Sequence, residues 1–177
     1  SANVSSWAKN GVGAMVKAGY MAGNNNMLNP KASITREEFA QILCSVAAKY
    51  VSQTGTYNDT VEGNLVVRGK DVTLDGATIK GDLIVGDGAG DSTITVNNTA
   101  IGGRVVVRGG GVNSVVFTNT KLGTVVVARP DGAVRLSTDA ASTPKEVFAE
   151  AGKQQIILNG SLAAVVVETA TPVVFNN

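Results

Sequence analysis

The chain has 177 residues, with 15 Lys or Arg against 14 Asp or Glu, so its formal net charge is +1. Without a basic run or face, nucleic-acid binding has little electrostatic support, and no stretch of about 18 apolar residues could span a membrane. The chain has no histidine, which removes the commonest general base and metal ligand and excludes Ser-His-Asp and Cys-His sites within one chain.

Glycine is abundant, at 21 residues, and together with many Val, Thr and Asn residues it indicates short strands joined by tight turns. The chain begins Ser1-Ala2 without an initiator methionine or a signal peptide, so we expect a processed protein or a fragment that has lost any targeting sequence.

Residues 7–18 predict a first helix. Ser5 or Ser6 can cap its start, and Gly19 fits the left-handed position that ends a helix. The apolar residues of this segment recur at helical spacing: Trp7, Val12, Met15 and Val16.

An asparagine-rich loop leads to a second helix. Thr35 followed by Glu38 has the sequence pattern of a capping box. Cys44, the single cysteine, lies in the apolar pattern of this helix, which predicts a buried small side chain. The apolar face consists of Phe39, Ile42, Leu43, Val46 and Tyr50. We therefore predict a helix–loop–helix module over residues 1–52, with little room for an independent core.

Four short motifs follow one another in this module: Trp7-Ala8, Gly19-Tyr20-Met21-Ala22-Gly23, Asn29-Pro30 and Ile34-Thr35-Arg36-Glu37-Glu38-Phe39. In this order they resemble an S-layer homology (SLH) repeat, over roughly residues 4–50. Glu37 stands where that family usually has alanine, so the acidic position of the family aligns with Glu38. The Phe-x-Asp segment that normally precedes the tryptophan is absent. Members of the family usually carry three repeats, which together make the binding grooves, whereas this chain shows one.

The resemblance implies non-covalent attachment to secondary cell-wall polysaccharide, often pyruvylated, and an extracellular location on the bacterial surface or in the wall. By the same resemblance, the candidate ligand-binding residues are Trp7, Gly23, Thr35, Arg36 and Glu38. Arg36 would lie in the first turn of a helix, where free N–H groups favour an anion and a guanidinium can hold a carboxylate. Trp7 could offer a flat face to a sugar ring. Ordinary structural roles are the alternatives: capping for Thr35 and Glu38, core packing for Trp7 and a solvated charge for Arg36.

After a linker at residues 53–62, two apolar blocks recur through residues 63–177 with a period near 20 residues. The first block reads Leu65-Val66-Val67, Leu83-Ile84-Val85, Val105-Val106-Val107, Val125-Val126-Val127, Val147-Phe148-Ala149 and Val165-Val166-Val167. The second block alternates as Val72/Leu74, Ile94/Val96, Val115/Phe117, Val134/Leu136, Ile156/Leu158 and Val173/Phe175. Two residues after most second blocks comes a residue that accepts positive φ: Gly76, Asn98, Asn119, Gly160 and Asn177.

This period predicts a mainly β fold, a parallel β-helix (solenoid) of about six coils behind the helical module. Each coil should add about 4.8 Å of length, with a local bulge at Ser142-Thr143-Pro144-Lys145. Val107, Val127 and Val167 should lie buried along one inner face.

The same data allow an antiparallel β-sandwich or meander, because the predicted corners include good two-residue hairpin turns. They are Asp75-Gly76, Asn97-Asn98 and Asn159-Gly160. The β-helix is favoured because apolar residues recur at equivalent places in every repeat and the first blocks lack polar alternation.

The solenoid offers few residues for chemistry. Its candidate acids are Asp71, Asp75, Asp82, Asp87 and Asp91. The predicted coils place Asp82 beside Arg104 in one column, which is most simply a surface ion pair. The segment from Gly86 to Asp91 resembles a calcium loop only faintly. We therefore expect no catalytic residue, no metal site and no cofactor.

The sequence favours a non-enzymatic surface protein whose helical module anchors it to wall polysaccharide and whose β-helix is a structural or display region. The alternative is a carbohydrate-active β-helix enzyme or a glycan-binding adhesin, which would need clustered carboxylates. Only Asn176 and Asn177 follow the predicted last strand, Val173-Val174-Phe175. An uncapped solenoid end exposes unpaired backbone groups, so we expect self-association through this end or the helical module unless a longer chain supplies the cap.

Overall fold

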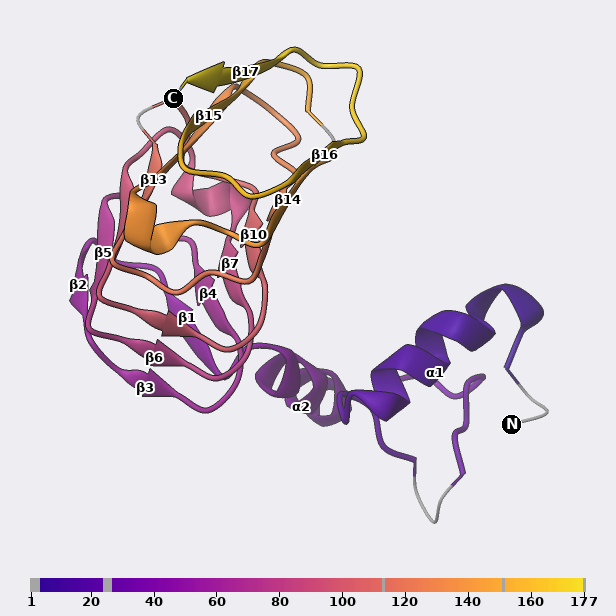
Figure 1. Ribbon diagram of the computed structural model, residues 1–177. Coiled ribbons are helices and arrows are strands. Elements are labelled where there is room, and N and C mark those ends of the chain that lie inside the picture. Colours follow the sequence, from indigo (N-terminus) through magenta and orange to yellow (C-terminus); the bar gives the residue numbers. More distant parts are fainter. Residues whose placement is uncertain (1–3, 24–26, 113, 151, 177) are drawn as a thin grey trace. The chain divides into compact units, whose positions relative to one another are not determined.

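The computed structural model describes residues 4–23, 27–112, 114–150 and 152–176, and the chain divides into two compact units, Ser1–Ala47 and Ala48–Asn177. The first unit is helical, with η1 (Ser6–Ala8), a short 3-10 helix, α1 (Lys9–Lys17) and α2 (Arg36–Val46). The second unit contains strands β1 to β17 and two further 3-10 helices, η2 (Asp87–Ala89) and η3 (Ala140–Ser142). Figure 1 shows its strands stacked in successive coils.

Three sheets form the walls of the second unit. The first sheet has seven strands, in the order β1 (Lys49–Val51), β4 (Leu65–Val67), β7 (Leu83–Val85), β10 (Val105–Val107), β12 (Thr124–Val127), β14 (Glu146–Ala149) and β16 (Val165–Val167). The second sheet also has seven, β2 (Gly55–Tyr57), β5 (Val72–Asp75), β8 (Ile94–Asn97), β11 (Val115–Thr118), β13 (Val134–Thr138), β15 (Ile156–Gly160) and β17 (Val173–Asn176). The third sheet contains β3 (Thr60–Val61), β6 (Thr78–Ile79) and β9 (Ala100–Ile101).

Every strand pair among the described residues is parallel, and each strand pairs with its counterpart in the preceding or following coil. The fold is therefore mainly β, a parallel β-solenoid of about six turns behind a short helical module, as predicted. The antiparallel alternative is wrong. The turn at Asp75-Gly76 leads into the next wall of the same coil and does not join two hairpin strands.

The solenoid core is made of inward-facing side chains that alternate with outward-facing ones along each strand. In β10 the first and third residues, Val105 and Val107, are fully buried and Val106 is half-buried. Val107 pairs with Val127, and both are fully buried, as predicted. The prediction that Val167 is buried in the same way is wrong, because β16 is the outermost described strand of its sheet and the side chain is 50% exposed.

An additional coil precedes those expected from the sequence. The segment 53–62, expected to be a linker, contains β2 and β3, which pair with β5 and β6. Val51 and Val61 are buried in the core of this coil, and Lys49 forms an ion pair with Asp59. The first coil resembles the later ones too little in sequence for the repeat pattern to include it, yet it has the same inward apolar residues.

The corners of the solenoid have the predicted backbone conformation. Gly76, Asn98, Asn119 and Gly160 all have positive φ, and Asn177 lies outside the described residues. The asparagine side chains also join the coils. The Asn119 side-chain amide donates to Asn98 at 2.8 Å, and the Asn98 amide donates to Asp75 at 2.9 Å.

One strand pairs in a register that the sequence does not predict. The repeat pattern places Leu136 level with Phe117, but in the structure Leu136 pairs with Val115 and Thr138 pairs with Phe117. The backbone N–H of Arg135 donates to Gly111 in the corner before β11, at 3.0 Å, which holds the start of β13 beside that corner. The predicted irregularity near Ser142 begins earlier, at η3, where the Asp139 side chain accepts a bond from the Ser142 N–H.

The helical unit follows the predicted boundaries closely. The first predicted helix is η1 followed by α1, and Gly19, with φ of +75°, lies just after α1 ends. The second helix ends at Val46, because Ala47 has extended backbone geometry. Tyr50, expected on the apolar face of this helix, lies instead in β1.

The two helices of this unit do not bury their apolar side chains. Neither α1 nor α2 contains a buried residue, and Phe39 and Leu43 are each 53% exposed. Cys44 is exposed, so the prediction that it is buried is wrong. The apolar spacing predicts the two helices correctly, but two short helices have too little surface to cover one another's apolar faces.

We expect Gly160→Ala to lower the free energy of unfolding more than Gly76→Ala. Both glycines have positive φ, +93° and +73°, so alanine at either position costs about 1–2 kcal/mol in backbone strain. A Cβ at Gly160 would also overlap the carbonyl oxygen of Thr138, whereas a Cβ at Gly76 meets nothing within 4 Å. Urea unfolding followed by circular dichroism measures both losses, and equal losses would contradict the close approach between coils at Gly160.

Candidate functional site

A groove of about 540 Å³ lies in the helical unit, between α1, α2 and the chain that joins them. Gly23 and Glu38 line this groove, whereas Trp7, Thr35 and Arg36 do not. Its lining is both polar and apolar, and its larger apolar residues are Val12, Tyr20, Met21, Met27, Leu28, Pro30, Ile34 and Ile42. Met27 and Leu28 are not among the residues predicted from the sequence, although two large apolar residues within a polar loop are a signal that could have identified them.

Trp7 lies in η1 and is 88% exposed. Its interpretation as a core residue is therefore wrong. The indole ring is a large apolar surface in contact with solvent, which is the arrangement that stacking on a sugar ring requires.

Thr35 and Glu38 form the predicted capping box at the start of α2. The hydroxyl of Thr35 accepts a hydrogen bond from the Glu38 N–H at 3.1 Å, and the Glu38 carboxylate accepts one from the Thr35 N–H at 2.9 Å. Each side chain thus satisfies a backbone N–H that the helix leaves free. Capping accounts for both residue types at these positions without a ligand.

Arg36 is the first residue of α2 and is exposed. It forms no ion pair within the described part of the chain. Glu37 beside it is stabilised as a carboxylate, because a backbone hydrogen bond and the Thr35 hydroxyl lower its pKa. Arg36 is therefore an accessible cation whose guanidinium donors are not used by a carboxylate of the described residues.

Gly23 is needed for a close approach of the chain to itself. A Cβ built at Gly23 would overlap the carbonyl oxygen of Met27. Glycine at this position keeps the two sides of the loop together and maintains the groove. The structure therefore brings Thr35, Arg36 and Glu38 together at one helix start, links Glu38 to Gly23 through the groove, and places Trp7 outside it.

The residues of this unit also match a known family. Residues 1–40 match the family model of the S-layer homology domain. The chain carries an SLH domain. No curated protein and no solved structure matches the chain.

SLH domains bind cell-wall polymers, and the domain indicates association with the cell surface or cell wall in bacteria. The match includes the positions of all five candidate residues and ends inside α2. None of the described helices has the length and apolar character needed to cross a membrane.

The candidate acids of the solenoid all have structural partners. Asp82, Asp87 and Asp91 form ion pairs with Arg104, Arg108 and Arg129 at 3.1, 3.0 and 2.7 Å. The Asp71 carboxylate accepts a bond from the Thr93 N–H, and Asp75 accepts one from Asn98. The predicted Asp82–Arg104 pair is confirmed. Among the described residues, no three acidic or cysteine side chains form a group that could hold a metal ion.

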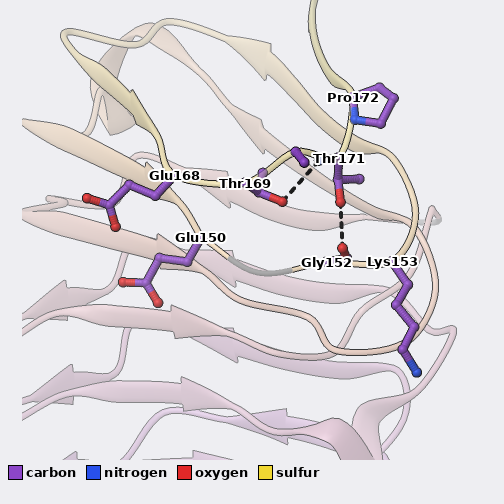
Figure 2. Close-up of a pocket in the computed structure, with 8 residues that line it drawn as sticks. Glu150, Gly152, Lys153, Glu168, Thr169, Thr171 and Pro172 are labelled. Atoms are coloured by element: carbon purple, nitrogen blue, oxygen red, sulfur yellow. Dashed lines mark hydrogen bonds between the residues drawn. The ribbon is translucent and has the colours of Figure 1, made fainter.

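An open hollow at the last described corner of the solenoid is lined by Glu150, Gly152, Lys153 and residues 168–172 (Figure 2). Glu150 and Glu168 extend side by side from neighbouring coils, while Lys153 points away from them. Lys153 pairs with Asp131 at 2.9 Å, and their hydrogen bond lowers the pKa of Asp131 and raises that of Lys153. The Thr171 hydroxyl donates to the Gly152 carbonyl oxygen. Lys153 and Thr171 are thus turned toward partners in the protein, while Glu150 and Glu168 point the other way, so the polar groups of this hollow do not converge on a common point.

We expect Thr35→Ala to loosen the first turn of α2, because it removes the acceptor of the Glu38 N–H. Loss of such a cap costs about 1 kcal/mol, so exchange of the Glu38 amide hydrogen should be roughly fivefold faster. Thr35→Ser retains the hydroxyl and is the matched control. Amide hydrogen exchange followed by NMR measures both, and unchanged protection in Thr35→Ala would mean that the capping box is not formed in solution.

Proposed function

We propose that this chain is a non-enzymatic surface protein whose SLH domain attaches it to secondary cell-wall polysaccharide and whose solenoid serves as a structural or display region. The observation that carries the proposal is the family match over residues 1–40 together with Arg36, an exposed cation in the first turn of α2 that forms no ion pair with any described residue. Acidic wall polymers, such as pyruvylated ones, carry carboxylates that a guanidinium binds through two parallel hydrogen bonds.

The remaining candidate residues fit this role to different degrees. Trp7 offers an exposed ring for contact with a sugar. The groove beside Gly23 and Glu38 is concave and has both polar and apolar lining, and Glu38 supplies a carboxylate oxygen that a sugar hydroxyl can donate to. Thr35 acts by holding the helix start in place, so that Arg36 projects from a fixed backbone.

The solenoid supports the display role through its construction. Its core is apolar and continuous from Val51 to Leu158, and four of its surface aspartates, Asp71, Asp75, Asp82 and Asp87, bond to a neighbouring coil. Such a rod keeps its shape without a ligand. A spacer that holds other parts of a protein away from a wall needs this property.

We expect Arg36→Ala to lose binding to purified cell-wall sacculi while the chain stays folded, because the guanidinium makes no ion pair within the described residues. Lys17→Ala is the matched control, since Lys17 is an exposed cation in the last turn of α1 of the same unit. Co-sedimentation with sacculi, before and after chemical removal of the wall polysaccharide, measures the binding. Equal binding by wild type and Arg36→Ala would refute this role of Arg36, and binding that survives removal of the polysaccharide would refute the proposed ligand.

The second candidate function, a carbohydrate-active solenoid enzyme or adhesin, has one observation in its favour. Glu150 and Glu168 lie on neighbouring coils beside an open hollow. A hydrolase needs two carboxyl groups facing one another across a bond, whereas these two extend in the same direction. Release of reducing ends from wall polysaccharide by the wild type, lost in Glu150→Gln, would establish this alternative.

A further inference from the structure

The outer face of the first sheet has an unbroken apolar column, which we call the outer stripe. Its members pair with one another from strand to strand across the whole sheet. They are Tyr50, Val66, Ile84, Val106, Val126, Phe148 and Val166. All face away from the core and are exposed or half-buried. The outward residues of an exposed sheet face are usually polar, so a stripe of this length indicates an interaction surface.

Charged residues flank the outer stripe on both sides. The leading flank, one position before each strand's first core residue, contains Asn64, Asp82, Arg104, Thr124, Glu146 and Ala164. The trailing flank, one position after the last core residue, contains Arg68, Gly86, Arg108, Ala128, Glu150 and Glu168. An apolar centre with a charged rim is the usual anatomy of a protein–protein interface.

At the three central strands β10, β12 and β14, the two flanks have the same arrangement of charge. Arginines flank β10 on both sides, at Arg104 and Arg108, and glutamates flank β14 on both sides, at Glu146 and Glu150. Strand β12 lies between these two strands and has uncharged flanks. The charge pattern therefore reverses sign across β12.

The flanking glutamates are not used by ion pairs in the part of the chain that the structure describes. Glu146, Glu150 and Glu168 form no ion pair among the described residues. Arg104 and Arg108 do pair with Asp82 and Asp87, yet their side chains remain 61% and 42% exposed. A guanidinium has five N–H donors, so each arginine can bind a second carboxylate.

We propose that the outer stripe is a self-association surface on which a second copy of this chain packs with its solenoid axis antiparallel. A two-fold axis along β12 brings β10 of one copy over β14 of the other. Arg104 then faces Glu146 of the second copy, and Arg108 faces Glu150. The stripes meet with Val106 against Phe148 and with Val126 against its own counterpart.

The alternative arrangements fit less well. A parallel pair would bring Arg104 against Arg108 and Glu146 against Glu150, so that like charges meet at both ends. A glycan would bring hydroxyl groups that need hydrogen-bond partners, and the aliphatic centre of the stripe has none. A second copy supplies an apolar stripe and the opposite charges in the same spacing.

The size of the outer stripe and its flanks determines how stable the dimer is expected to be. Five strands span about 20–25 Å, and the two flanks lie about 13 Å apart along a strand. This is smaller than a standard interface of about 800 Å² per partner, so the dimer should be weak in dilute solution. Chains held side by side on a surface would associate more readily, because attachment raises their effective concentration.

Sedimentation velocity of the full chain, from about 10 µM to about 1 mM, should show a concentration-dependent monomer–dimer equilibrium. Val126→Lys should raise the dissociation constant at least about tenfold, because it places two like charges opposite one another at the centre of the interface. Val116→Lys is the matched control. Val116 is also a half-buried, outward-facing strand residue, but it lies on the second sheet, and this variant should dimerise as the wild type does.

A charge-reversal pair tests the antiparallel arrangement. Glu150→Lys and Arg108→Glu should each weaken dimerisation, and an equimolar mixture of the two variants should restore it, because both cross-chain pairs are then complementary. Circular dichroism confirms that each variant is folded. The proposal is overturned if the chain stays monomeric up to about 1 mM. It is also overturned if Val126→Lys leaves the association unchanged, or if Val116→Lys weakens it equally. Failure of the mixed charge-reversal variants to dimerise would likewise overturn it.

Discussion

In-register stacking of the coils is the constraint on which the rest of the structure depends. A parallel strand satisfies its backbone N–H and C=O groups only through the strands on either side, so each coil of the solenoid is built against its neighbours. A slip of one residue would turn every core side chain outward. The unexpected pairing of β13 differs from the repeat pattern by two residues, which keeps Leu136 and Val134 facing inward. The core therefore tolerates a shift of two residues, whereas a shift of one residue would turn its apolar side chains outward.

The same register also aligns whatever the coils present to solvent. The ion pairs of Asp82 with Arg104 and of Asp87 with Arg108 each join one coil to the next, as do the amides of Asn98 and Asn119. Exposed ion pairs contribute little to stability, so the apolar core is the main source of it. The columns of outward-facing side chains contribute more to recognition than to stability, because similar side chains repeated at the strand spacing form a continuous surface. The outer stripe and its two flanks are the clearest case.

The helical unit is organised by local interactions, in contrast to the contacts between distant residues that hold the solenoid together. Its defined features are local, such as the reciprocal bonds of Thr35 with Glu38 and the close approach of Gly23 to Met27. Its apolar side chains remain largely exposed around a groove. Local bonds can fix the position of Arg36 on its helix without an extensive core. A small module can therefore hold an exposed cation at a defined position while leaving apolar surface available.

The sequence by itself determined the elements whose rules are local or periodic. The capping box followed from Thr35 and Glu38, the corners followed from residues that accept positive φ, and the parallel solenoid followed from a period near 20 residues. The candidate binding residues came from short motifs in a fixed order, and the family match covers the same positions. Each of these signals is carried by residues close together in the chain or by strict repetition.

The tertiary structure decided what depends on contacts between distant residues. Only the packing shows that Cys44 and Trp7 are exposed, because burial depends on whether other elements cover a face. Only the stacking shows that residues 53–62 belong to the first coil. Val51 and Val61 occupy core positions like those of the later coils, but their spacing along the sequence does not follow the repeat. The outer stripe was visible in the sequence as blocks without polar alternation, but the sequence could not place its members on one face. That required the register, which is set by hydrogen bonds between coils about twenty residues apart.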